Sequence, residues 1–287
     1  MEKDSIKSGI VNVFTGLIDR NNSKPGDYYD DEGFLMCGNC KTRKQTEVNL
    51  DFLGQGIKKV GCVCTCEKEK MEREERMAKE SERLNRIKAL KEQGIADPQY
   101  LQACIEKDDR SNLKISNAII RYTDKWKEMK DKNMGILFYG DVGRGKTFYA
   151  ACIANRLLEK GIPVIMTNIP ALITAMTKDF ESEKAKILSK ISNADLLVLD
   201  DLGVERETTY SAEKIQEIID TRYRSGRPLI VTTNLTPDEL KNPTELRYKR
   251  VYDRVLEMCF PIHVEGGSRR QEKSQNKREQ FKNLILE

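Results

Sequence analysis

The hydrophobic residues of this chain follow two kinds of pattern. Short continuous apolar runs, typical of strands buried on both faces of a parallel sheet, begin at Ile136, Pro163, Leu196, Leu229 and Pro261. Between and around them lie longer segments of helical composition or spacing, including Asn112–Lys130, Phe148–Leu158 and Ala171–Phe180. This alternation predicts a three-layer α/β domain built on a five-stranded parallel sheet.

The residues before this domain carry different patterns. Apolar positions from Asp4 to Arg20 recur at helical spacing and predict a helix whose apolar face must be covered by the protein's own core or by a partner. From Glu67 to Glu92 there is no Gly or Pro and few large apolar residues, which predicts a solvated connecting helix. We therefore divide the chain into a module at residues 1–66, a charged helical linker at 67–93 and an α/β domain at 94–287.

Composition agrees with this division. A chain of 287 residues with 38% hydrophobic residues can bury one full core and carry a smaller module. Its net charge of +4 is too small to require a nucleic-acid partner and does not exclude one. No apolar signal region follows Met1 and no run is long enough to cross a bilayer, so we expect a cytoplasmic protein with no membrane partner. In that compartment the eight cysteines would be thiols or metal ligands.

Five of these cysteines lie close together in the sequence and indicate a metal site. Cys37 and Cys40 form a C-x-x-C knuckle, and after twenty-one intervening residues come Cys62, Cys64 and Cys66. Two thiolates from each segment would complete the tetrahedral shell that Zn²⁺ prefers, and zinc binding would help a module with little core to fold. We expect Cys37, Cys40, Cys64 and Cys66 as ligands. Cys62 is an alternative, because it would share a face with Cys66 if a helix begins there.

A phosphate-binding loop is expected between the first strand of the sheet and the helix that follows. The sequence from Gly140 to Thr147 fits the pattern G-x-x-x-x-G-K-[ST]. Its glycines let backbone N–H groups turn inward around phosphate oxygens, Lys146 supplies charge and Thr147 offers a ligand for Mg²⁺. We expect nucleotide contacts from Gly140, Asp141, Val142, Gly143, Arg144, Gly145, Lys146, Thr147 and Phe148.

Polar residues end two later strands. One buried run ends in Asp200 and Asp201, and another ends at Asn234. A carboxylate beside a phosphate loop can reach the magnesium shell and the next can polarise a water for attack on the γ-phosphate, so we assign Asp200 to the metal and Asp201 to the water. Asn234 would orient that water; alternatively, it caps the helix that begins near Pro237.

Five motifs appear in a fixed order: GDVGRGKT, LLVLDDLG, VTTN, KRVYDR and GGSRR. Together they resemble the AAA+ helicase loaders of the DnaC/DnaI type, including phage relatives and the related IstB transposition helpers, over roughly Gly94 to Arg270. The resemblance implies an ATPase that binds ATP and Mg²⁺, holds single-stranded DNA and delivers a hexameric replicative helicase. It also implies homo-oligomers when ATP and DNA are bound, and an amino-terminal zinc module that engages the helicase.

The resemblance further implies roles for single residues. Arg250 matches the arginine that acts on a neighbour's ATP, with Arg254 one turn further as the reserve, and the G-x-S-x-R sensor places Arg270 at the nucleotide. The DNA-contacting positions of similar loaders match Phe180, Thr208 and Tyr210, whose aromatic members can stack on bases without reading sequence. Asp201 stands where many AAA+ ATPases carry Glu, and its shorter reach suggests slow, switch-like hydrolysis.

Other functions share parts of the pattern. A small-molecule kinase also uses a phosphate loop, although it would not require Asn234, Arg250 or a zinc module. A GTPase is disfavoured because no N-K-x-D motif follows the acidic strand. A transposition helper of the IstB kind shares the ATPase core and would differ mainly in its partner, so the sequence does not separate it from a loader.

Overall fold

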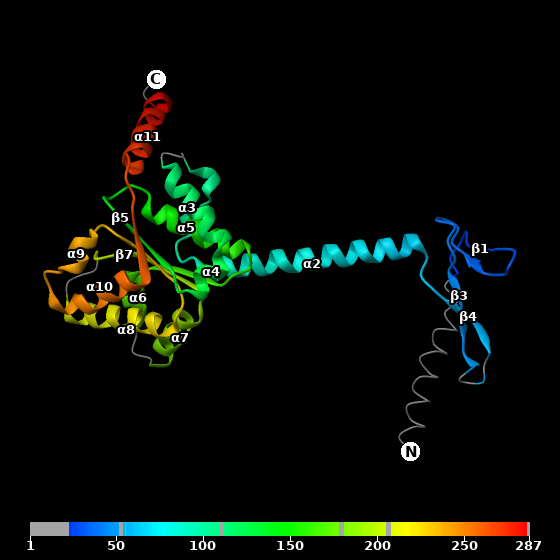
Figure 1. The fold of residues 1–287 in the computed structure, drawn as a ribbon. Helices are drawn as coiled ribbons and strands as arrows, with labels where there is room; N and C mark the ends of the chain where they lie inside the picture. Colours follow the sequence, from blue (N-terminus) through cyan, green and yellow to red (C-terminus); the bar gives the residue numbers. More distant parts are fainter. Residues whose placement is uncertain are drawn as a thin grey trace, which may run out of the picture. The chain divides into compact units, whose positions relative to one another are not determined.

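The computed structural model describes residues 23–51, 54, 56–108, 112–177, 181–204 and 208–285. The helix expected at Asp4–Arg20 lies outside the described residues. The chain divides into two compact units, Met1–Glu82 and Arg83–Glu287. The division falls within the segment expected to be a linker, and Figure 1 shows a single long helix, α2 (Thr65–Gly94), running through it.

The first unit is built from two small antiparallel ribbons. Strand β1 (Tyr28–Tyr29) pairs with β2 (Leu35–Met36), and β3 (Gln45–Asn49) pairs with β4 (Ile57–Gly61). Among its residues that the structure describes, few large apolar side chains are buried. The ring of Phe34 lies 4.2 Å from Cζ of Arg43 and 4.0 Å from Nζ of Lys59. Such a unit depends on interactions other than a large hydrophobic core.

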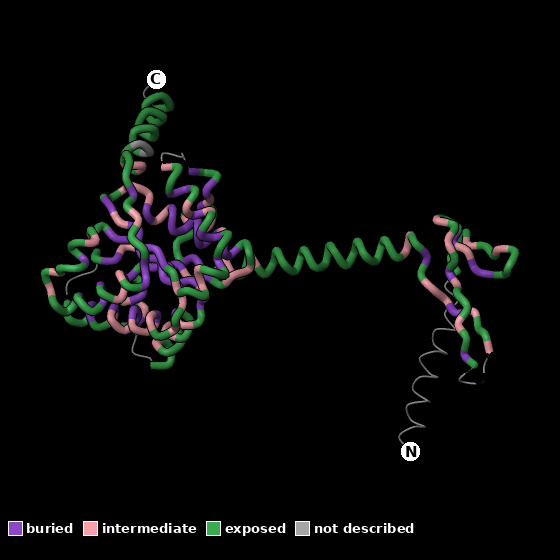
Figure 2. Tube along the Cα trace, in the orientation of Figure 1, coloured by how far each residue is buried: buried purple, intermediate pink, exposed green. Residues whose placement is uncertain are grey.

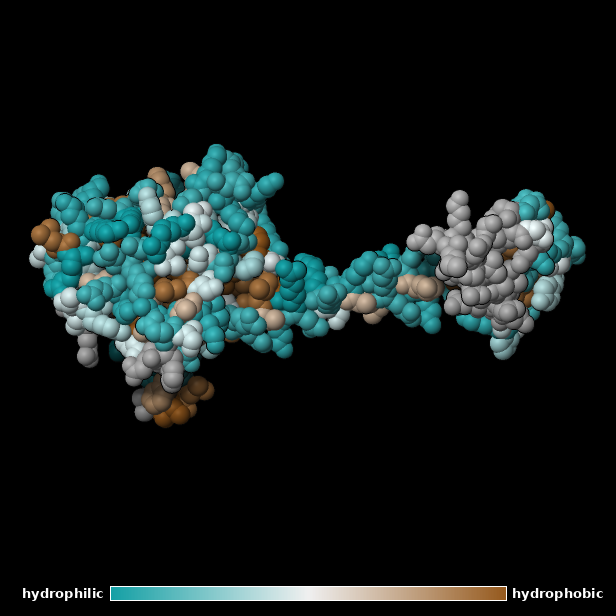
Figure 3. Space-filling model, turned by 90° about the horizontal axis from the view of Figure 1, so that it is seen from below, coloured by the Kyte–Doolittle hydropathy of each residue, from teal (hydrophilic) through white to brown (hydrophobic). Residues whose placement is uncertain are grey.

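Helix α2 is exposed along nearly its whole length. Gly94, its last residue, is the one position of the helix that is buried. Figure 3 shows mainly hydrophilic residues on the face of the helix that is in view. A Cβ on Gly94 would lie 2.4 Å from the carbonyl oxygen of Val164. The next residue, Ile95, bridges to Met166, so glycine allows the chain to approach the sheet edge.

A five-stranded sheet organises the second unit, as the sequence predicted. Its order is β6-β7-β8-β5-β9 and every neighbouring pair is parallel. The strands are β5 (Gly135–Tyr139), β6 (Val164–Asn168), β7 (Leu196–Leu202), β8 (Leu229–Thr233) and β9 (Cys259–His263). Parallel strands align their carboxyl ends at one edge, where the polar residues that follow several of them can meet.

Helices cover both faces of this sheet (Figure 1). One face carries α3 (Leu113–Asp124), α4 (Trp126–Asp131) and α5 (Lys146–Glu159), and the other carries α6 (Ile169–Met176), α7 (Glu181–Asn193), α8 (Thr209–Ser225) and α10 (Leu246–Met258). Figure 2 shows the buried residues gathered between these layers. The remaining elements are the short helices η2 (Pro98–Tyr100), η3 (Ile105–Lys107) and α9 (Pro237–Lys241), and α11 (Arg269–Ile285). No described helix is both long and apolar enough to span a membrane.

Two predicted helices have different bounds in the structure. The segment expected as one helix over Asn112–Lys130 forms α3 and α4, which meet at Lys125. The helix expected at Ala171–Phe180 begins earlier, at Ile169, because the Asn168 side chain accepts a hydrogen bond from the N–H of Ala171 at 2.7 Å and caps it.

A buried arginine joins the amino ends of two strands. Arg222 of α8 has no exposed surface and donates hydrogen bonds of 2.5–3.1 Å to the carbonyl oxygens of Ile191, Ala194, Asp195 and Pro228. Burial lowers the pKa of Arg222 to about 9. Its guanidinium thereby satisfies carbonyl groups where α7 ends and where β7 and β8 begin.

Candidate nucleotide site and metal centre

The phosphate-loop motif connects the end of β5 to the start of α5. Gly140, Gly143 and Gly145 have φ of 135°, 84° and 96°, which L side chains rarely adopt. A Cβ on Gly143 would lie 2.6 Å from Oγ of Ser268, and one on Gly145 would lie 3.2 Å from Nε of Arg269. The loop therefore needs glycine both for its conformation and for the close approach of the segment that begins α11.

Lys146 is held inside this loop. It is only 6% exposed, and its Nζ donates to the carbonyl oxygens of Gly140 (2.7 Å) and Asp141 (2.8 Å) and to Oδ1 of Asn234 (2.8 Å). Burial lowers the pKa of Lys146, and the nearby carboxylates oppose this effect. The structure thus brings together a lysine and an asparagine that lie 88 positions apart in the sequence.

Asn234 does not cap a helix. The N-cap of α9 is Thr236, whose hydroxyl accepts from the N–H of Glu239 while the Glu239 carboxylate accepts from the N–H of Thr236. This reciprocal capping box completes the start of α9 without Asn234. The capping alternative from the sequence is therefore wrong, and the amide of Asn234 faces the phosphate loop.

The two aspartates lie beside a buried threonine of β8. Thr232 Oγ1 donates to Oδ1 of Asp200 at 2.5 Å and accepts from the N–H of Asp201 at 3.0 Å. Burial is the main cause that raises the pKa of Asp200, while hydrogen bonds from the hydroxyls of Thr232 and Thr147 lower it. Asp200 and Thr147, the two expected magnesium ligands, are therefore neighbours, and hard oxygen donors of this kind fit that ion.

Two adjacent arginines at the start of α11 have different surroundings. Arg269 is largely buried, and its Nη2 donates to Oδ1 of Asp108 (2.6 Å) and to the hydroxyl of Tyr149 (2.9 Å). Its N–H donates to the carbonyl oxygen of Gly143 at 3.0 Å. Arg270, the expected sensor, is exposed. It lies beside the same glycine, because a Cβ on Gly143 would lie 3.8 Å from Cβ of Arg270.

Sequence reasoning missed Asp108. Its side chain has no exposed surface and also accepts a hydrogen bond from Oγ of Ser116 at 2.5 Å. A buried carboxylate needs a cation and hydrogen-bond donors around it. No motif links Asp108 with Arg269, which is 161 positions away, so nothing in the sequence pointed to this pair.

The expected trans arginine lies on α10, which packs on the face of the sheet opposite α5. Arg250 is 61% exposed, and its Nη2 lies 3.7 Å from Oδ2 of Asp220. Arg254 also forms an ion pair with Asp220, is less exposed and stacks 5.0 Å from the centre of the Tyr223 ring. Of the two candidates, Arg250 is thus more accessible to another molecule.

The expected DNA-contacting residues are only partly within the described chain. Phe180 lies outside the described residues. Thr208 caps α8, where its hydroxyl accepts from the N–H of Ser211 at 3.1 Å. Tyr210 is 43% exposed, and Nζ of Lys214 lies 5.5 Å from its ring centre. An exposed ring beside an ammonium group has the chemistry to stack on a base near a phosphate.

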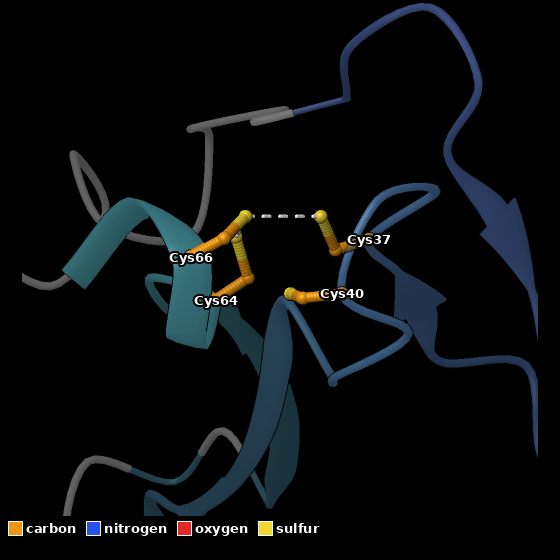
Figure 4. Close-up of side chains that lie close together, drawn as sticks. All are labelled: Cys37, Cys40, Cys64 and Cys66. Carbon is orange, nitrogen blue, oxygen red and sulfur yellow. Dashed lines mark hydrogen bonds between the residues drawn. The ribbon is translucent and has the colours of Figure 1, made fainter. Parts of the chain in front are cut away.

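Four cysteines of the first unit form one cluster. Cys37 and Cys40 follow β2, whereas Cys64 and Cys66 lie at the start of α2, and Figure 4 shows their sulfur atoms pointing toward one another. All four Sγ atoms lie within 4.8 Å of each other. Cys62 lies outside this cluster, with Sγ 3.7 Å from the carbonyl oxygen of Arg43.

The cluster fits a tetrahedral metal site. Zn–S bonds of about 2.3 Å place sulfurs about 3.8 Å apart in a tetrahedron, and the Sγ atoms of Cys37 and Cys66 are 3.7 Å apart and those of Cys64 and Cys66 3.4 Å apart. Hydrogen bonds from the Thr42 hydroxyl and from backbone N–H groups lower the pKa of Cys40 to about 5. The knuckle thus favours the thiolate form that binds metals.

A buried ion pair supports the same knuckle. Nζ of Lys44 donates to Oδ2 of Asp27 at 2.6 Å, and Oδ1 of Asp27 accepts from the N–H of Gly38 at 3.0 Å. A Cβ on Gly38 would lie 2.0 Å from the carbonyl oxygen of Gly26. Glycine at the second position of C-G-N-C therefore lets the loop around Gly26 pack directly on the cluster.

Comparison with known proteins identifies the family of this chain. The profile of the IstB-like ATP binding protein family matches residues 59–277. The chain is 33% identical over 142 residues to the replicative helicase loader DnaC of Escherichia coli (strain K12), an alignment that covers 48% of this chain and 57% of the relative. It is 27% identical over 177 residues to the replicative helicase loader DnaI of Bacillus subtilis (strain 168), covering 58% and 57%.

A solved structure shares the fold. The DnaC helicase loader aligns with a TM-score of 0.51 at 23% identity, covering 59% of this chain and 100% of that one. The curated relatives are matched over little more than half of their own length. The family profile, in contrast, extends over most of this chain and includes the phosphate loop, the acidic strand and the sensor segment. This chain therefore belongs to the IstB-like ATP-binding protein family, with a P-loop fold of the AAA+ type and sequence similarity to the DnaC/DnaI-type helicase loaders.

Proposed function

We propose that this chain is an ATPase that loads a replicative helicase onto single-stranded DNA. The observation that carries the ATPase part is the meeting of Lys146, Asn234 and the two aspartates at one edge of the sheet. Its relatives of known name, which are helicase loaders, support the loading part. Family membership also disfavours a small-molecule kinase, because a kinase would share only the phosphate loop with this chain.

The residues of the site have separate roles in this proposal. Nζ of Lys146 donates to two backbone carbonyl oxygens of the phosphate loop. When ATP binds, phosphate oxygens would take the place of these acceptors. Thr147 and Asp200 would hold Mg²⁺, which neutralises phosphate charge during transfer. Asp201 would orient and polarise the attacking water, together with Asn234. Arg270 would contact the phosphates from the start of α11, since it is exposed beside Gly143.

Two variants test this division of roles. Lys146→Ala should abolish ATP binding, because it removes the charge that faces the ground-state phosphates. Asp201→Asn should bind ATP and fail to hydrolyse it, because that carboxylate acts only on the attacking water. Fluorescent ATP-analogue binding and phosphate release measure the two steps separately. Loss of binding in both variants would show that Asp201 does not have a separate hydrolytic role.

Hydrolysis would require a second copy of the chain. Arg250 is exposed on the face of the sheet opposite α5, so in this proposal it serves a neighbour's phosphoryl group within a homo-oligomer assembled on ATP and DNA. A guanidinium donated across a boundary stabilises the charge of the transferring group. The DNA itself would be held by stacking on Tyr210, with Thr208 and Phe180 nearby in the sequence-based assignment.

The four-cysteine cluster is proposed to bind zinc as a structural ion. The four cysteine sulfurs would fill a tetrahedral shell and leave no position for a water, as in closed structural sites. The module it holds together would be the part of the chain that engages the helicase. Co-purification with a hexameric helicase tests this role directly: capture by the full chain, and loss of capture by a Cys37→Ser, Cys40→Ser variant, is the expected result.

A transposition helper is the second candidate, and the family profile supports it because that profile describes IstB-like proteins. Both candidates use the same ATPase core, so partner capture separates them. Retention of a transposase in place of a replicative helicase, in an ATP-dependent manner, would favour the helper.

A further inference from the structure

The two aspartates of the ATPase site lie on a β-bulge. Along β7 and β8 the pairing passes from Leu199 with Val231 to Leu202 with Thr233, so two residues of β7 oppose the single residue Thr232. A bulge disrupts the local ladder and re-aims the side chains on the longer strand. On the other side of β7 the pairing with β6 stays regular as far as Asp200.

Thr232 supplies the hydrogen bonds that the bulge requires. Its side chain has no exposed surface, and one hydroxyl both donates to the Asp200 carboxylate (2.5 Å) and accepts from the Asp201 N–H (3.0 Å). A hydroxyl has one proton to donate and lone pairs to accept, so both bonds can exist together. This single group therefore contacts both members of the acidic pair.

Asp201 adopts a backbone conformation that needs such support. Its φ is 61°, in the left-handed region that few non-glycine residues occupy. Strained conformations of this kind persist where the surrounding structure fixes them, and they cluster at functional sites. The hydrogen bond from the Asp201 N–H to Oγ1 of Thr232 fixes this turn.

We propose that Thr232 is a positioning residue of the ATPase: its hydroxyl sets the bulge that directs Asp200 to the magnesium ion and Asp201 to the attacking water. This inference rests on the proposed ATPase function. In this inference Thr232 contacts neither nucleotide nor metal, and it acts only through the Asp200 carboxylate and the Asp201 main chain.

The next residue of β8 provides a matched control. Thr233 is equally buried, and its hydroxyl donates to the carbonyl oxygen of Leu202 (2.6 Å) and accepts from the N–H of Leu235 (3.1 Å). Thr233→Val therefore removes the same group, with the same number of hydrogen bonds and the same burial, from the same strand. The difference is that the Thr233 hydroxyl bonds to these two main-chain groups, whereas the Thr232 hydroxyl bonds to the Asp200 carboxylate.

The test is a Mg²⁺ titration of fluorescent ATP-analogue binding, alongside phosphate release. Thr232→Val should need about tenfold to a hundredfold more Mg²⁺ for half-maximal tight binding, the effect of losing one hydrogen bond to a charged group. Thr232→Ser, which keeps the hydroxyl, should restore the wild-type requirement. Thr233→Val should lower the melting temperature as much as Thr232→Val while leaving the Mg²⁺ requirement unchanged.

Equal Mg²⁺ requirements in Thr232→Val and Thr233→Val would overturn the inference, even if both proteins hydrolyse ATP. Should Thr232→Val fail to fold, hydrogen exchange on the wild-type chain decides: the Asp201 amide should be as protected as its neighbours in β7, and fast exchange would refute the bulge contact. A wild-type chain that binds no ATP would instead refute the proposed function itself.

Discussion

Replacing Arg269 should weaken the fold of the second unit, whereas replacing its neighbour Arg270 should not. In Arg269→Gln the fully buried carboxylate of Asp108 loses its cation and, among the described residues, keeps the hydroxyl of Ser116 as a donor. Breaking a buried pair costs about 3–5 kcal/mol, and the partial exposure of Arg269 (18%) favours the lower end. A loss of about 3 kcal/mol should lower the melting temperature by roughly 6–12 °C.

Calorimetry of the full chain without nucleotide measures this shift. Arg270→Gln is the matched control, because Arg270 is exposed. This variant should melt within about 2 °C of the wild type, as surface substitutions do. It should also bind ATP more weakly than the wild type. The pair Arg269→Gln and Asp108→Asn should lose less stability together than the sum of the two single variants. An Arg269→Gln protein with the wild-type melting temperature would show that the ion pair contributes nothing to the fold.

Further changes give distinct outcomes. Metal analysis should find about one zinc per chain, and chelation should unfold the amino-terminal unit; a metal-free unit that still melts cooperatively contradicts a structural zinc. Arg250→Ala should bind ATP but hydrolyse it slowly, and mixing this variant with Lys146→Ala on single-stranded DNA should restore some ATPase activity. Undiminished hydrolysis by Arg250→Ala alone would exclude the trans role. Arg222→Met should destabilise by about 3 kcal/mol or more, because several buried carbonyl groups lose their donor; urea denaturation measures this, and unchanged stability contradicts it. Tyr210→Ala should weaken binding of single-stranded DNA by about 1–3 kcal/mol. The more exposed aromatic Phe260 provides the control variant, and equal effects of the two substitutions in fluorescence anisotropy would rule out stacking on Tyr210.

The fold follows largely from local sequence signals. Five apolar runs predicted the strands, and the structure confirms a five-stranded parallel sheet. The helix bounds were less predictable: one expected helix divides at Lys125, and another begins early because Asn168 caps it. Capping and breaks depend on a few side-chain contacts, which periodicity does not encode.

The sequence by itself determined the chemistry of this protein wherever that chemistry sits in one short segment. The phosphate loop is such a segment, because its glycines, its lysine and the start of α5 all lie within a few consecutive residues. The same holds for the aspartate pair at the end of β7 and for the C-G-N-C knuckle.

Tertiary structure decided what depends on residues far apart in the chain. It joined Arg269 to Asp108, Asn234 to Lys146 and Thr232 to both aspartates. These contacts form because burial removes water as a partner, so each polar group must find its hydrogen bonds wherever the packed sheet and helices place another polar group. Spacing along the sequence carries no record of which groups will meet in this way.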